Sequence, residues 1–214
     1  MTSTSRHSRS TTSTLQQAGF SLVEMLTVIT VLSIMLAATT QISRSWTSQE
    51  ISASATRIAQ DLNLAQTLAM KRGHPVELRF YKSYDQAIAS EEPHYHTYQL
   101  VGYDSRSQRV IPLGEPQRLE GTVVVIPSTR YSTVMLAERA FDFTKDPLPG
   151  TVTAAMKVCC VEFRPNGATS LDPDPNHQWT ISLSSEADSR PGPALPKTAR
   201  TLLITPETGA VTIY

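Results

Sequence analysis

One carboxylate lies inside the long apolar run of this 214-residue chain. The run covers residues 22–38, and Glu24 is its one charged residue. A charged side chain at membrane depth is costly, so a carboxylate in such a segment is a functional hypothesis by default. Gly19 and Phe20 lie just before the run.

The residues before the run indicate how it would be oriented. Residues 1–18 are rich in Ser and Thr, and their charged side chains are Arg6 and Arg9. A short basic flank before an apolar run is retained on the cytoplasmic side of a membrane. About 17 apolar residues are the lower limit for a helix that spans a bilayer. We therefore expect a transmembrane segment at about residues 20–40.

The spacing Gly-Phe-x-x-x-Glu directly before this run resembles the processing site of type IV prepilins and type II secretion pseudopilins. The resemblance implies a leader peptide at residues 1–19, cleavage after Gly19, and N-methylation of Phe20 by a prepilin peptidase/N-methyltransferase. It also implies that Glu24 serves in filament assembly by pairing with the amine of Phe20 on a neighbouring subunit.

Two other interpretations of the N-terminus stay open. An ordinary secretory signal has the same basic start, with a shorter apolar core that ends at a small-residue cleavage site. Ala37 and Ala38 would supply such a site. An uncleaved signal anchor would leave Gly19 and Glu24 without a role. The position of the Gly-Phe-x-x-x-Glu spacing favours the prepilin interpretation.

Helical periodicity continues beyond the apolar run. Apolar or small residues recur at steps of three and four, as on one buried face of a helix; they are Ile51, Ala55, Ile58, Leu62, Ala65 and Ala69. Gly73 offers a C-terminal cap and Pro75 prevents continuation. The sequence therefore predicts one helix over residues 20–72, transmembrane over about 20–40 and amphipathic over 41–72.

Residues 73–214 are predicted to form one β-rich globular domain. Most of the fourteen prolines follow residue 90, which indicates many turns. Strands are predicted at residues 76–80, 95–101, 122–126, 157–163, 178–183, 201–205 and 210–214. Apolar and charged residues alternate over 76–80, so we expect one face of this strand to be buried. Asn166-Gly167 predicts a turn, and residues 206–209 predict a closing hairpin.

A long N-terminal helix packed on an antiparallel sheet is an α+β arrangement, and it resembles the pilin fold. Three segments resemble minor pseudopilins of the GspH/FimT type: the helix exit at residues 61–72, the turn at 163–167 and the hairpin at Thr208-Gly209. Over nearly the whole chain the sequence looks like the Verru_Chthon cassette protein D group.

This resemblance implies a minor structural subunit of a type IV pilus or of a type II secretion pseudopilus. The implied partners are the peptidase, other pilins or pseudopilins, and the inner membrane. The N-terminus would be cytoplasmic, and residues 73–214 would be periplasmic or part of an extracellular filament. The sequence does not choose between a pilus, a secretion pseudopilus and another surface assembly.

The β-rich domain gives weaker evidence for a functional site than the N-terminal segment does. His94 and His96 alternate on one strand face and are candidate metal ligands with His177, but no cysteine or clear carboxylate completes the set. We find no nucleophile elbow, metalloprotease spacing or Gly-rich phosphate loop. The sequence therefore predicts no enzyme, metal site or cofactor.

Cys159 and Cys160 point to opposite faces of a strand, so we expect unpaired core or near-core thiols, with a vicinal disulfide as the rare alternative.

Nucleic acid is not an expected partner. The 19 basic and 19 acidic residues balance, so bulk charge does not attract DNA. Some FimT-like minor pilins are implicated in DNA capture through a basic C-terminal region. Here residues 208–214 contain no basic residue, and prolines interrupt Arg190, Lys197 and Arg200. DNA binding depends on clustered contacts with phosphates, so a DNA- or surface-binding minor pilin is the alternative rather than the expectation.

Overall fold

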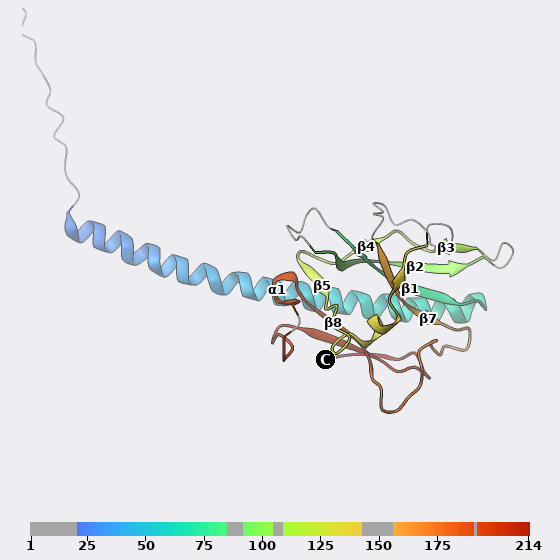
Figure 1. The fold of residues 1–214 in the computed structure, drawn as a ribbon. Helices are drawn as coiled ribbons and strands as arrows, with labels where there is room; N and C mark the ends of the chain where they lie inside the picture. The colour runs from blue at the N-terminus through green and yellow to red at the C-terminus, as the bar shows by residue number, and fades with distance from the viewer. Residues whose placement is uncertain (1–20, 85–91, 105–108, 143–155, 191) are drawn as a thin grey trace, which may run out of the picture. The chain divides into compact units, whose positions relative to one another are not determined.

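The computed structural model describes residues 21–84, 92–104, 109–142, 156–190 and 192–214. They form an α+β fold in which one long helix, α1 (Leu22–Arg72), is followed by ten strands (Figure 1). The helix and the α+β class confirm the sequence prediction. The chain divides into two compact units, Met1–Ile42 and Ser43–Tyr214. The second unit contains the C-terminal part of α1 and the whole sheet.

All strands belong to one antiparallel sheet. They are β1 (Val76–Ser83), β2 (His94–Tyr103), β3 (Val110–Pro112), β4 (Gln117–Arg118), β5 (Val123–Val125), β6 (Arg139–Ala140), β7 (Lys157–Phe163), β8 (Trp179–Ser185), β9 (Arg200–Ile204) and β10 (Val211–Ile213). Their order is β10-β9-β8-β5-β2-β1-β7-β6, and β3 and β4 pair with β2. Two 3₁₀ turns, η1 (Thr133–Ala137) and η2 (Glu186–Asp188), complete the described elements.

The predicted strands are present with ends shifted by a few residues, and the segment 157–163 coincides with β7. The pattern does not predict β3, β4 and β6, which contain two or three residues each. A strand this short is too brief to show periodicity.

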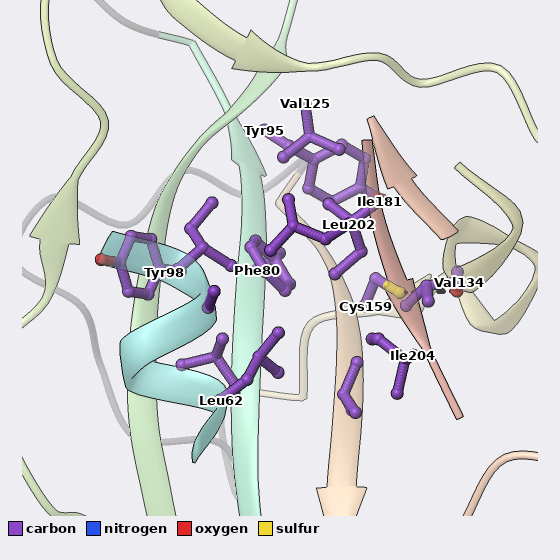
Figure 2. Packing of buried hydrophobic residues seen from close by; sticks show 14 of the residues in the cluster. Leu62, Phe80, Tyr95, Tyr98, Val125, Val134, Cys159, Ile181, Leu202 and Ile204 are labelled. Carbon is purple, nitrogen blue, oxygen red and sulfur yellow. Dashed lines mark hydrogen bonds between the residues drawn. The ribbon is translucent and has the colours of Figure 1, made fainter. Parts of the chain in front are cut away.

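The face of α1 predicted to be buried packs against the sheet. Ile51, Ala55, Ile58, Leu62, Ala65 and Ala69 are all 0% exposed. They join strand residues such as Phe80, Ile181 and Leu202 in one core cluster, which Figure 2 shows around Leu62. At the end of α1, Gly73 has a φ of 68°, so glycine provides the C-terminal cap that the sequence predicts.

Strand β1 has the predicted buried face, and its polar face is buried as well. Every residue of β1 except Lys82 is buried. Apolar side chains of β1 join the core cluster with α1, whereas Glu77 and Arg79 are only 4% and 2% exposed. Charged residue types alone do not reveal that the second face is covered.

The two turns singled out in the sequence meet at one residue of α1. The side-chain amide of Gln66 donates to the carbonyl oxygens of Gly167 and Thr208, at 2.7 and 2.6 Å. Gly167 and Gly209 have φ values of 86° and 67°. A Cβ on Gly209 would lie 2.5 Å from both Gln66 Nε2 and the Gly167 carbonyl oxygen. Gln66 thus links both turns to the helix by hydrogen bonds, and the missing side chain of Gly209 leaves room for the Gln66 amide.

Candidate functional site

The residues assigned to processing and assembly are Gly19, Phe20 and Glu24. Gly19 and Phe20 lie outside the described residues. Glu24 lies in the first turn of α1. The partial positive charge of a helix N-terminus suits a carboxylate at this position. The processing and assembly roles of these three residues stay predictions.

The first part of α1 is apolar on all sides and exposed. Its large apolar side chains between residues 22 and 36 are 48% to 82% exposed. They are Leu22, Val23, Met25, Leu26, Val28, Ile29, Val31, Leu32, Ile34, Met35 and Leu36. A helix that is apolar all round is one that is buried in its working environment.

Hydroxyl groups in this segment are satisfied within the helix. Thr27, Thr30 and Ser33 each donate to a backbone carbonyl three or four residues earlier, at 2.8, 2.7 and 2.8 Å. This back-bonding lets Ser and Thr side chains enter an apolar environment. The carboxylate of Glu24 has no hydrogen-bond or ion-pair partner among the described residues.

In the part of the chain that the structure describes, no helical segment has the combined length and apolarity needed to cross a membrane. The expected span begins at Phe20, which is not among those residues. The transmembrane segment at about residues 20–40 stays a prediction.

A buried ion pair lies on the sheet face opposite the α1 core. Arg79 Nε is 2.6 Å from Glu77 Oε2, and the two side chains are 2% and 5% exposed. The Tyr103 hydroxyl donates to Glu77 Oε1 at 2.6 Å, so both carboxylate oxygens are engaged. Glu162 of β7 lies opposite Glu77. Burial and then the charge of Glu77 raise the pKa of Glu162. The cluster satisfies itself, which indicates a structural role.

Glu138 is a second ionic centre. Its carboxylate accepts hydrogen bonds from the Tyr95 hydroxyl and from Lys157 Nζ, both at 2.5 Å. Lys82 Nζ lies 3.7 Å away. Burial alone would raise the pKa of Glu138, but the hydrogen bonds from Lys157 and Tyr95 and the two lysine charges outweigh it and lower the pKa. This cluster links β1, β2 and β7 at the residue that precedes β6.

The histidines are not brought together as a metal site. His94 Nε2 lies 3.7 Å from Glu186 Oε1, and His96 Nδ1 lies 3.1 Å from the His94 carbonyl oxygen. The ring of His177 instead packs against that of Trp179, with a centroid distance of 4.5 Å. Among the described residues, no group of three or more His, Cys, Asp or Glu is placed to hold a metal ion.

Both cysteines are free, as the strand alternation predicts. Cys159 is buried and Cys160 is half-buried. The Cys159 thiol donates to the carbonyl oxygen of Val134 at 2.9 Å (Figure 2). Burial raises the pKa of Cys159 well above its ordinary range and that of Cys160 to about 11. Both side chains therefore stay protonated thiols near neutral pH.

A pocket of about 190 Å³ lies where α1 meets β2. The Tyr98 hydroxyl donates to Asp61 Oδ2 at 2.7 Å, and Arg57 donates to the side chain of Gln117. Burial, with the Asp61 hydrogen bond second, raises the pKa of Tyr98, so this phenol remains a donor. These four lining side chains are therefore already paired with one another.

The three basic residues near the C-terminus differ in their exposure to solvent. Arg190 and Lys197 are exposed, whereas Arg200 is half-buried at the start of β9. The guanidinium of Arg200 donates to the Ala199 carbonyl at 3.1 Å. Strand β10 contributes no basic side chain. Nothing in this arrangement favours the DNA-binding alternative.

Sequence reasoning missed three polar residues with clear structural roles: Gln66, Glu77 and Glu138. The pairing of Glu77 with Arg79 was visible as two opposite charges on one face of a strand, two residues apart. Gln66 and Glu138 bond to residues far away along the chain. No local pattern signals such contacts.

Comparisons with known proteins address the N-terminus. Residues 15–40 match the family model described as "Prokaryotic N-terminal methylation motif". The matched segment contains Gly19, Phe20 and Glu24, so the presence of a prepilin-type motif is confirmed. The chain has no significant match among curated protein sequences.

Among solved structures, the chain is similar to the type IV minor pilin FimU of Pseudomonas aeruginosa. The two are 11% identical, the match covers 78% of this chain and 89% of that chain, and the TM-score is 0.42. A likeness this distant carries no conclusion about the present chain.

Proposed function

We propose that this chain is a minor pilin- or pseudopilin-like structural subunit, processed by a prepilin peptidase and assembled into a type IV pilus or a type II secretion pseudopilus-like filament. One observation carries the proposal: residues 22–36 are apolar all round, exposed, and contain one unpartnered carboxylate. The methylation motif at residues 15–40 supports it. A subunit that moves from a membrane into a bundle of helices has this surface covered in both places.

Processing occurs after Gly19 and leaves Phe20 as the N-methylated first residue. The new amine is a cation at the end of an apolar helix, and Glu24 is an anion near the same end. In a helical bundle the two pair between neighbouring subunits. Removing one partner of a buried pair costs about 3–5 kcal/mol, so this pairing fixes the axial register of each added subunit.

The proposed location follows from the order of segments. Arg6 and Arg9 keep the leader in the cytoplasm, the apolar part of α1 is held in the inner membrane, and the β-rich domain lies in the periplasm. The buried ion pairs of that domain are satisfied internally, which supports a structural subunit rather than an enzyme. The partners are the peptidase/N-methyltransferase and other pilins or pseudopilins.

The decisive test is mass spectrometry of the N-terminus of the protein purified from its own membrane. We expect an N-methylated chain that begins at Phe20. An N-terminus at Met1, or one close to Thr39, would contradict the proposal and indicate an ordinary anchor or a secreted domain. A Glu24→Ala variant serves as a control, because it is expected to be cleaved and methylated at the same position.

A further inference from the structure

The turn that follows β7 contains an asparagine directly followed by a glycine, Asn166-Gly167. The Gly167 N–H donates to the Arg164 carbonyl at 2.9 Å, and the Arg164 N–H donates to the Ala168 carbonyl at 2.8 Å. Gly167 has a φ of 86°, a conformation that favours glycine. The turn therefore requires a glycine next to an asparagine that is exposed to solvent.

These two residues are able to react with each other. The Gly167 backbone nitrogen attacks Cγ of Asn166, a new N–Cγ bond forms, and the Cγ–Nδ2 bond breaks. The proton of the attacking nitrogen leaves with the amide group as ammonia, and a five-membered succinimide ring remains. Water then opens this ring at one of its two carbonyls, which gives aspartate or isoaspartate. Glycine hinders the attack least, because it has no Cβ beside the nitrogen.

One hydrogen bond in the turn activates the carbon that is attacked. The Ala168 N–H donates to Asn166 Oδ1 at 3.1 Å. Negative charge develops on this oxygen as the nitrogen adds to Cγ, and a backbone N–H aimed at such an oxygen stabilises the transition state. The same bond holds the asparagine side chain against its own backbone. The electrophile is thus polarised and oriented in the folded chain.

Other contacts restrain the nucleophile. The Gly167 N–H is engaged with the Arg164 carbonyl, and Gly167 is buried although Asn166 is exposed. A Cβ on Gly167 would lie 3.4 Å from both Gln66 Nε2 and Met70 Sδ, so two side chains of α1 cover this residue. Gln66 also donates to the Gly167 carbonyl at 2.7 Å. The nitrogen becomes free to attack only when the turn separates from α1.

We propose that Asn166 is a site of spontaneous conversion to aspartate and isoaspartate, and that docking of its turn on α1 controls the rate. Conversion is slow while Gln66 holds the Gly167 carbonyl, and local opening of the turn releases the nitrogen. Isoaspartate adds one methylene to the main chain, which moves Gly167 away from Gln66. This inference is independent of the proposed assembly, because residues 1–42 take no part in it.

The chain contains two internal controls. It has three asparagines, and the other two, Asn63 and Asn176, precede Leu64 and His177. All three asparagines are exposed, so exposure does not distinguish them. The side chains of Leu64 and His177 hinder attack by the nitrogen of their own residue, whereas glycine does not. In the unfolded chain, conversion should therefore be fastest at Asn166.

The test uses the full-length chain in detergent at mildly alkaline pH, where a backbone nitrogen loses its proton more readily. Tandem mass spectrometry of its peptides locates the change from amide to acid, and enzymatic methylation detects isoaspartate. The same chain in guanidinium chloride gives the rate without docking. We expect Asn166 to convert about tenfold more slowly in the folded chain, because several hydrogen bonds must open first.

A variant of the helix tests the role of docking. Gln66→Glu keeps the size of the side chain, but its carboxylate does not donate to the Gly167 carbonyl. It should speed conversion of Asn166 in the folded chain by about fivefold and leave the rate in guanidinium chloride unchanged. Gln60→Glu, at an exposed position of the same helix, is the matched control and should change neither rate. The Tm of both variants distinguishes local opening from global unfolding.

Three results would overturn the proposal. If Asn166 converts no faster than Asn63 and Asn176 in guanidinium chloride, the site lacks the assigned reactivity. Equal rates at Asn166 in the folded and the unfolded chain would show that docking does not control the reaction. Equal acceleration by Gln66→Glu and Gln60→Glu would assign the effect to the added charge and not to the contact with the turn.

Discussion

Glu24 and Glu77 are both carboxylates flanked by apolar residues, but the structure gives them different surroundings. Glu77 is buried and uses both oxygens within its own chain, with Arg79 and Tyr103 as partners. Glu24 lies on an exposed apolar helix and has no partner among the described residues. The contacts of Glu77 are thus complete within the fold, whereas the described residues provide no contact for the Glu24 carboxylate.

Glu24→Ala is expected to leave cleavage intact and to abolish incorporation into filaments. The reason is that the neighbouring Phe20 amine would then be buried without its counter-charge, which costs about 3–5 kcal/mol. The measurement is the fraction of the variant recovered in sheared filaments beside unmodified subunits. Thr27→Val is the matched control, because its hydroxyl bonds only to the helix backbone. Normal incorporation of Glu24→Ala would remove the assembly role.

The contributions of Glu138 and Glu162 to the free energy of unfolding are expected to change in opposite directions with pH. The folded-state pKa of Glu138 is lowered, so its contribution is present above the unfolded pKa, about 4.3, and is lost as the pH falls through the folded pKa. The pKa of Glu162 is raised, so its contribution is present below the unfolded pKa and is lost as the pH rises through the folded pKa.

Thermal unfolding of Glu138→Gln and Glu162→Gln measures this difference. At neutral pH, Glu138→Gln should have a lower Tm than the parent and Glu162→Gln a higher one. Both differences should shrink as the pH falls below about 4. Parallel pH profiles for the two variants would contradict the assigned pKa shifts.

At the scale of elements, the turns that meet α1 depend on glycine to different degrees. Gly73 and Gly209 both have positive φ, but a Cβ on Gly73 meets nothing within 4 Å, whereas one on Gly209 meets the backbone oxygen of Gly167 at 2.5 Å. Gly114 has neither constraint. The three positions thus separate the cost of backbone conformation from the cost of steric overlap.

Alanine at these three glycines should lower Tm in the order Gly209, Gly73, Gly114. Gly73→Ala should cost about 1–2 kcal/mol from its left-handed backbone, or about 2–8 °C in a domain of this size. Gly209→Ala should cost more, because Gln66 and the Gly167 turn must also move. Gly114→Ala is the control and should leave Tm unchanged or slightly raised. Equal effects at Gly73 and Gly209 would contradict the close packing of the hairpin on Gln66.

Breaking the buried ion pair of β1 is expected to lower the free energy of unfolding strongly. Replacing both of its residues by apolar ones is expected to lower it much less. Glu77→Gln removes the carboxylate that lies 2.6 Å from Arg79 Nε in this buried pair, for a loss of about 3–5 kcal/mol in unfolding free energy. The double variant Glu77→Leu/Arg79→Met should recover most of that loss, because apolar residues of similar volume need no partner. Chemical denaturation measures both. A double variant less stable than Glu77→Gln would show that the pair itself adds net stability.

At the scale of the whole molecule, the two units differ in what they need from outside. The unit Ser43–Tyr214 contains the core cluster of α1 and the sheet, whose residues are buried within it. The apolar residues 22–36 belong to the other unit, Met1–Ile42, and are exposed. The chain thus combines a domain that has its own core with a helical segment whose apolar side chains are exposed.

A chain that begins at Ser43 is therefore expected to fold without detergent and to leave the membrane fraction. Circular dichroism should show one cooperative thermal transition, with a Tm within a few degrees of that of the full-length protein. The full-length chain in detergent is the control. Loss of a cooperative transition would mean that residues 1–42 are needed for the domain to fold, which would contradict the division into two units.

Features encoded by neighbouring residues were predictable from the sequence. The end of α1 follows from Gly73 and Pro75, its buried face from the three- and four-residue steps, and most strands from local alternation. The N-terminal motif is equally local, since Gly19, Phe20 and Glu24 lie within six residues. Each of these depends on backbone sterics or on helix periodicity, which act over one or two turns of chain.

Contacts between distant residues were decided only by the tertiary structure. The alternation of residues in β1 predicted one buried face, but it does not show that Glu77 and Arg79 on the other face are buried too. Gln66 meets turns about 100 and 140 residues away. Burial and partnership of a polar group depend on what the fold brings next to it, and that is a property of the packed chain rather than of any segment.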